Sequence, residues 1–261
     1  MSALGPLRER VVVVTGGTQG VGRGIARSFL EAGAQVVVGA RKPPAQPIAV
    51  GERAAVFEPL NVRVPDEIDR AIEAVLARFA RLDVWINNAG GSPPSAAATA
   101  SARFTASIIE LNLTAALLCS QKAHAVMAAQ PEGGCIVQIA SVSGMRPSPG
   151  TAAYGAAKAG LISATQSLAV EWAPKVRVNA VSPGLVQTEL SELHYGDERG
   201  VRAAAATVPL ARLATPEDVG AACVFLAGPD ASYISGANLV LHGAGERPAF
   251  LDAVAAAQRA R

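Results

Sequence analysis

The feature that most constrains this chain is an alternation of short β-branched runs with longer segments of helical period. The short runs are Val11–Thr15, Val36–Ala40, Ala55–Leu60, Val84–Asn87, Cys135–Ser141, Arg177–Val181 and Asn238–Leu241. They are continuous in Val and Ile rather than alternating with polar residues, which is typical of strands buried on both faces of a parallel sheet. Helices are expected between them, at Val21–Ala32, Pro65–Ala80, Ser101–Ala129, Thr151–Trp172 and Pro216–Gly228. The pattern predicts an α/β fold with a doubly wound parallel sheet, helices on both faces and right-handed crossovers.

Length and composition favour one domain over the whole chain. The chain has 261 residues, of which 50% are hydrophobic, enough for one substantial core. Lys42–Pro47 holds three prolines where a second crossover helix would begin, so a loop is expected there. Glu189–Val208 is a polar insertion with an alanine-rich half, and we expect it to form a substrate lid. The C-terminal stretch Ala249–Arg261 is expected to be helical.

Charge and cysteine usage exclude several classes of protein. The chain has 23 Lys and Arg against 21 Asp and Glu, and this net charge of +2 gives no field that would attract nucleic acid or an anionic membrane. Cys119, Cys135 and Cys223 are widely spaced and form no C-x-x-C pair, so neither disulfides nor a zinc site is indicated. The three histidines lack the spacing of metal ligands, and no metal is expected. Because no window is long and apolar enough for a signal or a membrane span, we expect a cytoplasmic protein.

A glycine-rich turn follows the first strand directly and opens the first helix. It reads Thr15-Gly16-Gly17-Thr18-Gln19-Gly20-Val21-Gly22. A dinucleotide site requires this context, because glycines let the backbone approach a pyrophosphate and a helix N-terminus offers unpaired N–H donors. The spacing is G-x-x-x-G-x-G rather than G-x-G-x-x-G, and a purely structural glycine turn is the alternative. The turn predicts cofactor contacts at Gly16, Thr18, Gln19, Gly20, Val21 and Gly22.

A second turn-forming sequence, Asn87-Asn88-Ala89-Gly90, ends the fourth strand. The carboxyl ends of parallel strands form the edge at which doubly wound proteins bind ligands. Asn side chains can satisfy loop backbone groups, and a glycine permits close approach of a nucleoside. We expect cofactor contacts at Asn88, Ala89 and Gly90, with an Asn-rich turn that binds nothing as the alternative.

The strongest chemical signal is Tyr154 followed four positions later by Lys158. Positions i and i+4 share one face of a helix, so the phenol and the ammonium are expected to approach each other. A cation about 4 Å away at an effective dielectric near 20 contributes roughly 4 kcal/mol, which is about three pKa units. This would bring the pKa of a tyrosine down from about 10 toward neutrality, and it predicts that Tyr154 serves as general acid and base.

Two further polar residues complete a candidate catalytic set. Ser141 lies thirteen positions before Tyr154 at the end of a strand, where it can hydrogen-bond the substrate oxygen. Asn112 is polar in an otherwise apolar helical segment and can hold a proton-relay water. A turn-forming serine and a backbone-bonded asparagine are the alternatives.

These motifs, together with Asn179 and Pro183-Gly184-x-x-x-Thr188, resemble those of the short-chain dehydrogenase/reductase family over nearly the whole chain. The resemblance implies a single Rossmann-type domain, a homotetramer or homodimer, and a catalytic tetrad matching Asn112, Ser141, Tyr154 and Lys158. It implies further cofactor contacts at Tyr154, Lys158, Pro183, Gly184, Val186 and Thr188, of which Val186 and Thr188 meet the carboxamide. Asn61-Val62 replaces the family's common Asp-Val, which keeps hydrogen bonding toward adenine without the charge. His242 stands where Asp is commoner, and its role is left open.

The residues after the second strand bear on the choice of cofactor. NAD-specific sites place a carboxylate there to bind the ribose 2′-hydroxyl, but this chain has Ala40 followed by Arg41 and Lys42. A guanidinium can bind a 2′-phosphate through two N–H groups. NADP(H) is therefore favoured over NAD(H), with Arg41 as its contact. An arginine that stacks on adenine or points to solvent is the alternative.

Together these residues predict an NAD(P)-dependent oxidoreductase that transfers a hydride between the cofactor and a secondary alcohol or ketone. A catalytically silent nucleotide-binding redox sensor or scaffold is the alternative from another class, and an epimerase or dehydratase is the alternative among enzymes. The expected partner is a small molecule, with neither nucleic acid nor membrane. Expected substrate walls are Gly91–Ser95, Ser143, Met145, Arg146, Leu185 and the lid, with Arg146 as one possible anion contact.

Overall fold

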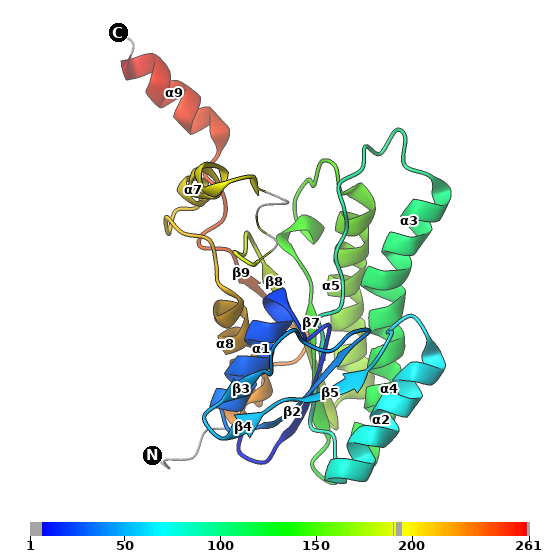
Figure 1. Ribbon diagram of the computed structural model, residues 1–261. Coiled ribbons are helices and arrows are strands. Elements are labelled where there is room, and N and C mark those ends of the chain that lie inside the picture. Colours follow the sequence, from blue (N-terminus) through cyan, green and yellow to red (C-terminus); the bar gives the residue numbers. More distant parts are fainter. Residues whose placement is uncertain (1–6, 190, 192–194, 260–261) are drawn as a thin grey trace.

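A seven-stranded parallel sheet runs through the centre of the molecule (Figure 1). The computed structural model describes residues 7–189, 191 and 195–259. The strand order is β5-β2-β1-β6-β7-β8-β9, so the chain winds outward from β1 in both directions, and the predicted doubly wound sheet is confirmed. The strands are β1 Val11–Thr15, β2 Gln35–Ala40, β5 Val56–Pro59, β6 Val84–Asn87, β7 Gly134–Ile139, β8 Val176–Pro183 and β9 Asn238–Leu241.

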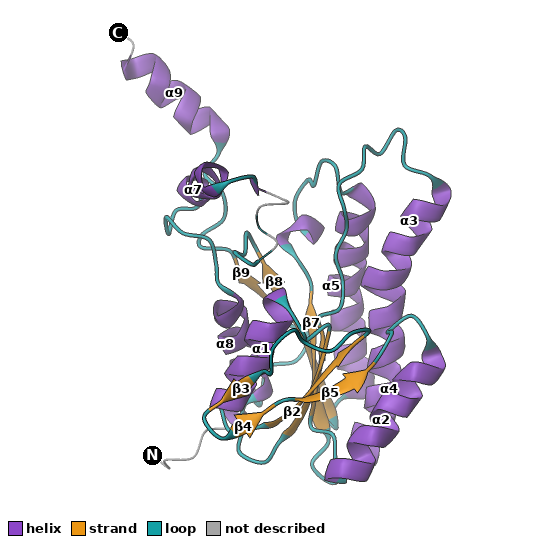
Figure 2. Cartoon of the chain, in the orientation of Figure 1, coloured by secondary structure: helices purple, strands orange, loops and turns teal. Residues whose placement is uncertain are grey.

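Helices cover both faces of this sheet (Figure 2). On one face lie α1 Gly20–Glu31 and α8 Pro216–Ala227. On the other lie α2 Pro65–Phe79, α4 Ala115–Ala129 and α5 Ala152–Trp172, and α3 Ala102–Ile109 runs into α4 through a π-helical turn at Glu110–Thr114. Among the described residues, further helical segments are α7 Glu198–Thr207, α9 Ala249–Arg259 and short 3₁₀ turns at Val142–Gly144 and Pro229–Ala231. In Figure 1, α9 extends away from the body of the molecule.

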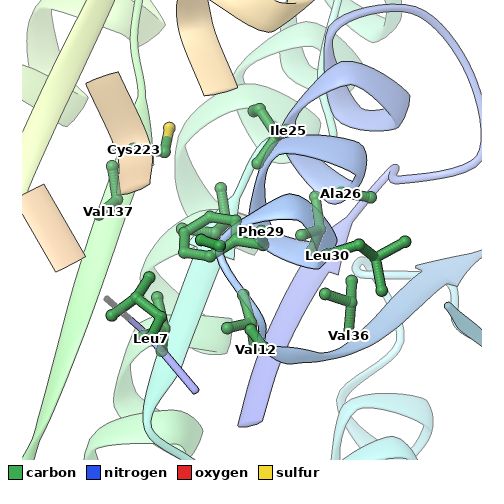
Figure 3. Close-up of a cluster of buried hydrophobic side chains, with 14 of the residues drawn as sticks. Leu7, Val12, Ile25, Ala26, Phe29, Leu30, Val36, Val137 and Cys223 are labelled. Carbon is green, nitrogen blue, oxygen red and sulfur yellow. The ribbon is translucent and has the colours of Figure 1, made fainter. Parts of the chain in front are cut away.

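The core between the sheet and α1 is built from close-packed apolar side chains (Figure 3). Phe29 and Ile25 of α1 are fully buried above the Val12 side of β1. Two glycines bring α1 and α8 together: a Cβ on Gly24 would lie 2.2 Å from Pro216 Cβ, and one on Gly220 would lie 2.2 Å from Ser28 Oγ. This packing fixes α1, and with it the glycine-rich turn before α1, against the carboxyl edge of the sheet.

A buried polar network lies on the opposite face. Asn87 Nδ2 donates to Ser120 Oγ at 2.8 Å and to Gln138 Oε1 at 2.9 Å, and Trp85 Nε1 donates to Asn87 Oδ1. Buried polar groups are costly unless paired, and here each group bonds another across β6, β7 and α4. Asn87 is therefore part of the core, one residue before the candidate site.

The structure corrects two expectations about single elements and confirms two others. The predicted helix Ser101–Ala129 is α3 and α4 separated by the π-helical turn. The crossover from β2 to β5 contains a small antiparallel pair, β3 Ala49–Val50 with β4 Arg53–Ala54, which the sequence did not indicate. The predicted loop at Lys42–Pro47 is confirmed. The predicted C-terminal helix is present as α9, and residues 260 and 261 lie outside the described part.

Contrary to the expectation from the sequence, one helical stretch is long and apolar enough to cross a membrane by length and composition alone. It is Ala102–Ala129, with a mean hydropathy of 1.3 in its most apolar window. In the structure this stretch contains α4, which packs against β6, β7 and β8 of the sheet. The stretch is therefore a helix of the sheet's outer layer.

Candidate active site

The ends of β1 and β6 are tied together at the carboxyl edge of the sheet. Thr15 Oγ1 donates to Ile86 O and accepts from the backbone N–H groups of Asn88 and Ala89, at 3.0 and 3.1 Å. Asn88 Nδ2 donates in return to Thr15 O and to Gly16 O. The two turns expected to contact a cofactor thus form one unit. Thr15 is the residue that joins them, and its only signal in the sequence is a hydroxyl at the end of a buried strand.

The glycine-rich turn leaves the N-terminus of α1 open to an anion. Gly16 and Gly20 have φ values of +63° and +52°, which glycine adopts without strain. Gln19 provides no side-chain cap for α1, and no acidic residue lies in its first turn. The N–H of Gly20 instead donates to the carboxylate of Glu189 at 2.8 Å. An anionic oxygen already accepts from this helix end, so the residues present fit the pyrophosphate of a dinucleotide.

Asn112 lies on the π-helical turn, which aims its side chain at the loop after β6. Its Oδ1 accepts from Gly91 N at 2.8 Å, while its Nδ2 donates to Gly91 O and to Ile108 O. A Cβ on Gly90 would lie 2.6 Å from Asn112 Oδ1, so only glycine fits there. Both amide hydrogens of Asn112 bond backbone oxygens, as expected from the alternative that this residue is a backbone-bonded asparagine. A water held by this side chain would have only Oδ1 to bond.

Ser141, Tyr154 and Lys158 converge beside this loop. Ser141 begins the 3₁₀ turn after β7 and hydrogen-bonds the Tyr154 phenol. The Lys158 Nζ lies 5.6 Å from the centre of the Tyr154 ring and donates to the backbone oxygen of Ile139 at 2.7 Å. Gly155, next to Tyr154, packs so closely that a Cβ would lie 2.8 Å from Ser143 O. The first turn of α5 thus packs closely on the 3₁₀ turn that follows Ser141, which we call the serine turn.

Burial shifts the pKa values of both titratable groups toward their neutral forms. It lowers the pKa of Lys158 to about 8. It raises the pKa of Tyr154, and the hydrogen bond with Ser141 only partly opposes this rise. The expectation that the Lys158 charge brings the pKa of Tyr154 down toward neutrality is therefore wrong for the cofactor-free chain. The physical reason is that removing the phenolate from water outweighs the hydrogen bond with Ser141.

The other residues expected to contact the cofactor lie along the same edge or beside it. Arg41 follows β2 and is exposed. Asn61 Oδ1 accepts from Arg63 N, and Val62 is buried in the core with its side chain away from solvent. At the end of β8, Gly184 N donates to Leu241 O.

The segment after β8 is anchored before it reaches Thr188. Gln187 N donates to Ala214 O, Ala214 N donates to Leu185 O, and Val186 forms a bridge with Ala214. Asn179, further back on β8, bonds Ile234 O and Ala237 N and so fixes the connection to β9. Its role is structural.

A cavity of about 290 Å³ lies between the serine turn, the ends of β8 and β9, and the residues after α7. Of the expected wall residues, Met145, Arg146 and Leu185 line it, while Gly91–Ser95 and Ser143 do not. The sequence did not identify four of the residues that line it, namely Val142, Val240, Gly245 and Glu246, and it gave Gly184 as a cofactor contact. His242 also lines the cavity and packs against Gly184, whose Cβ would lie 2.8 Å from His242 Cβ.

The charge of Arg146 is paired, and the expected lid is described in part. Arg146 Nη2 donates to Glu246 Oε1, so it is not a free anion contact. Of Glu189–Val208, residues 190 and 192–194 lie outside the described part of the chain. The remainder includes α7, and Val208 after α7 lines the cavity.

In the described part of the chain, neither cysteines nor metal ligands form a second centre. Cys119, Cys135 and Cys223 are free and buried. Within residues 7–189, 191 and 195–259, no group of three or more His, Cys, Asp or Glu side chains could hold a metal ion.

Comparison with known proteins identifies the family. The family model described as enoyl-(acyl carrier protein) reductase matches residues 16–243, which span both turns, the Ser141–Tyr154–Lys158 group and β9. The chain belongs to the short-chain dehydrogenase/reductase family. It is an NAD(P)-dependent oxidoreductase of that family that acts on alcohol or ketone substrates, which excludes the silent nucleotide-binding module as the chain's class.

The relatives are similar over almost their whole length but differ in substrate. A 3-oxoacyl-[acyl-carrier-protein] reductase of Synechocystis is 36% identical over 91% of this chain and 97% of its own. The cis-4-hydroxycyclohexanecarboxylate dehydrogenase of Sinomonas cyclohexanicum is 37% identical over 90% of this chain and 96% of its own. The ligand-free aldohexose dehydrogenase of Thermoplasma acidophilum superposes with a TM-score of 0.85 at 29% identity, covering 93% of this chain and 96% of its own.

Proposed function

We propose that this oxidoreductase transfers a hydride reversibly between NADP(H) and uncharged secondary alcohols or ketones, with Tyr154 as the acid–base group. The observation that supports the proposal is the convergence of Ser141, Tyr154 and Lys158 next to a glycine turn that fits a dinucleotide.

Each residue of the group has one task in the proposed reduction. The Tyr154 phenol donates its proton to the carbonyl oxygen, and the Ser141 hydroxyl donates a hydrogen bond to the same oxygen. When bound, the dinucleotide would supply the hydride that the carbonyl carbon accepts. The buried ammonium of Lys158, held in place by Ile139 O, stabilises the phenolate that remains. Oxidation of an alcohol uses Tyr154 as the base.

Replacement of the phenol tests the proposal directly. Tyr154→Phe should lower kcat by at least about a hundredfold, because a general acid is lost, while the Kd of the cofactor stays within a few-fold. The measurement is the change in nicotinamide absorbance with a panel of alcohols and ketones. Tyr233→Phe is the matched control, since Tyr233 is fully exposed on the surface. Near-normal kcat in Tyr154→Phe would contradict the assignment.

The proposed preference for NADP(H) depends on Arg41. This guanidinium is exposed just after β2, and no ion pair involves it in the described part of the chain. β2 lies beside the glycine turn, because Gly16 N donates to Gly39 O at 2.7 Å. A free guanidinium at this place can donate two hydrogen bonds to a 2′-phosphate.

Two variants test the cofactor preference. Arg41→Ala should shift kcat/KM toward NAD(H) by about ten- to a hundredfold, because a hydrogen bond to a charged group contributes about 1.5 to 3 kcal/mol. Ala40→Asp should shift it the same way by repelling the phosphate. Lys42→Ala, the neighbouring exposed cation, is the control. An unchanged ratio in Arg41→Ala, or a wild type that prefers NAD(H), would refute the preference.

The cavity supports an uncharged, mainly apolar substrate. Half of the residues that line it have apolar side chains, and its arginine is paired with Glu246. Its volume of about 290 Å³ suits a small ring or a short acyl group rather than a large polycyclic molecule. We propose that α7 and Val208 cover it. The same substrate panel tests this, since neutral ketones should be turned over faster than keto acids of equal size.

We also propose that the active form is a homo-oligomer. Only 28% of the most apolar stretch of Ala102–Ala129 is buried within the single chain. On the neighbouring α5, a stripe of small side chains at helical spacing is exposed, namely Ala152, Ala156, Ala159 and Ser163. Such surfaces allow helices of two copies to pack closely.

The free, buried state of all three cysteines supports a reducing compartment, and we propose the cytoplasm. Cell fractionation tests this location.

A further inference from the structure

The N-terminus of α1 is capped by a residue far away in the sequence. Most helices are capped by the residue just before them, but Gln19 makes no side-chain cap here. The Gly20 N–H donates instead to Glu189 Oε1 at 2.8 Å across 169 positions. The contact brings a carboxylate from the segment after β8 onto the helix end at which the proposed cofactor places its pyrophosphate.

A carboxylate and a pyrophosphate cannot share this helix end. One N–H group makes one strong hydrogen bond, and two like charges within about 4 Å repel each other by about 1 kcal/mol in water and by more near a protein surface. The position is otherwise open: a Cβ on Gly20 would meet only Thr188 Cγ2, at 3.8 Å. The carboxylate of Glu189 is therefore the group that stands in the way of the phosphates.

The residues around Glu189 allow it to leave without disturbing the sheet. Upstream, Gln187 is held by the backbone of Ala214. Thr188 and Ser191 flank Glu189 in a local turn, in which Thr188 N donates to Ser191 Oγ at 2.7 Å and Ser191 N donates to Thr188 O. Glu189 itself is exposed and lies at the rim of this turn. Because Ser191 is buried and its backbone oxygen accepts from Tyr195 N, the exposed side chain of Glu189, rather than the turn, is the part that moves away from Gly20.

We propose that Glu189 is an intramolecular competitor of the cofactor pyrophosphate, so that it sets the affinity for the dinucleotide and must leave Gly20 before the cofactor binds. This inference depends on the proposed cofactor site. It assigns to Glu189 a role opposite to that of a simple helix cap, because removal of a cap weakens a binding site built on the helix, whereas removal of a competitor strengthens it. An affinity measured for a partly blocked site is reduced by the fraction of molecules in which the site is open.

The test is calorimetric titration of the cofactor-free protein with ADP and with NADP⁺, which needs no catalytic turnover. Glu189→Ala should lower both Kd values by about three- to tenfold. Glu189→Gln keeps an oxygen for the Gly20 N–H but loses the charge, and it should lower them by a smaller factor. The matched control is Glu198→Ala, which removes the same charge from the exposed first turn of α7 and should change Kd by less than twofold.

Each outcome decides the matter. Weaker or unchanged ADP binding in both Glu189 variants overturns the competitor role, and so does equal tightening in Glu189→Ala and Glu198→Ala, because that would be a general effect of charge. If Glu189→Ala does not fold, the sign of the change in Glu189→Gln decides. If the wild type and every variant fail to bind both ADP and NADP⁺, the proposed cofactor site itself is wrong, which is a different failure.

Discussion

At the scale of single residues, the site holds the ammonium group of Lys158 in a buried position, where its positive charge is unfavourable. Lys158 is 4% exposed and has one backbone oxygen, that of Ile139, as its hydrogen-bond partner. Burial lowers its pKa from 10.5 to about 8. The folded state therefore binds this proton less tightly than the unfolded chain does, and the protonated lysine lowers the stability of the fold at neutral pH.

The buried lysine makes stability depend on pH in a predictable direction. The unfavourable contribution is fully present below about pH 8 and is relieved as the pH rises toward 10.5, because over that range the unfolded chain holds the proton that the folded chain has lost. The free energy of unfolding of the wild type should rise by about 2 to 3 kcal/mol relative to Lys158→Met between pH 7 and pH 10. Urea unfolding at both pH values measures this.

Lys158→Met also loses the hydrogen bond to Ile139 O, but this loss is the same at both pH values. It therefore cancels when the free energy of unfolding at pH 7 is subtracted from that at pH 10. Lys175→Met, at an exposed lysine, is the control and should show no such rise. A wild type whose stability runs parallel to that of Lys158→Met would mean that the ammonium is solvated in solution.

At the scale of elements, the π-helical turn between α3 and α4 is the local irregularity that serves the site. A regular α-helix through Glu110–Thr114 would rotate the residues on either side relative to each other, and Asn112 would lose its register with the loop after β6. With the extra residue in the turn, the Asn112 amide reaches Gly91 N and Gly91 O while α4 still packs on the sheet. The inserted residue thus allows α4 to pack on the sheet while Asn112 holds the loop after β6.

Truncation of Asn112 should loosen this loop. Asn112→Ala removes the bonds to Gly91 and Ile108, and we expect the free energy of unfolding to fall by about 1 to 3 kcal/mol because polar backbone groups lose their partners. The Gly91 amide should exchange its hydrogen faster, as measured by hydrogen exchange of the folded protein. Thr114→Ala, at an exposed position of the same turn, is the control. Unchanged protection of Gly91 would show that the amide does not hold the loop.

At the scale of the whole molecule, the two edges of the sheet have different roles. The carboxyl edge holds the site. At the amino edge, the Asp83 carboxylate accepts from Arg10, Arg81 and the backbone of Val11. Burial acts to raise the pKa of Asp83, but these hydrogen bonds outweigh it and the pKa is lowered. An ionic cluster thus fixes the starts of β1 and β6 at the end of the sheet away from the chemistry.

The outer surface of α4 and α5 is the proposed contact between copies of the chain in the homo-oligomer. If copies associate through it, the wild type should have a mass of two or more chains by light scattering. Val170→Lys should shift the mass toward one chain, because Val170 is 81% exposed on α5 and a charge there would be buried between copies. Leu210→Lys, also exposed but not on these helices, is the control. A monomeric wild type would refute the proposed assembly, and an oligomer insensitive to Val170→Lys would place the interface elsewhere.

The sequence by itself determined the class of fold, the two turns at the carboxyl edge and the pairing of Tyr154 with Lys158. These features depend on local rules, namely which residues suit a buried strand, where glycine is needed, and which positions share a helix face. The sequence also predicted one long helix at Ser101–Ala129, because its residues on both sides of the π-helical turn favour a helix and the turn carries no glycine or proline to mark it.

Only the tertiary structure decided the features that depend on residues far apart in the chain. The pKa of Tyr154 rises because desolvation is set by everything packed around the phenol, which a pair spacing does not contain. Arg146 is neutralised by Glu246, one hundred positions away, and the helix end at Gly20 is capped by Glu189. Charges and hydrogen bonds act through space rather than along the chain, so their partners are known only once the chain is folded.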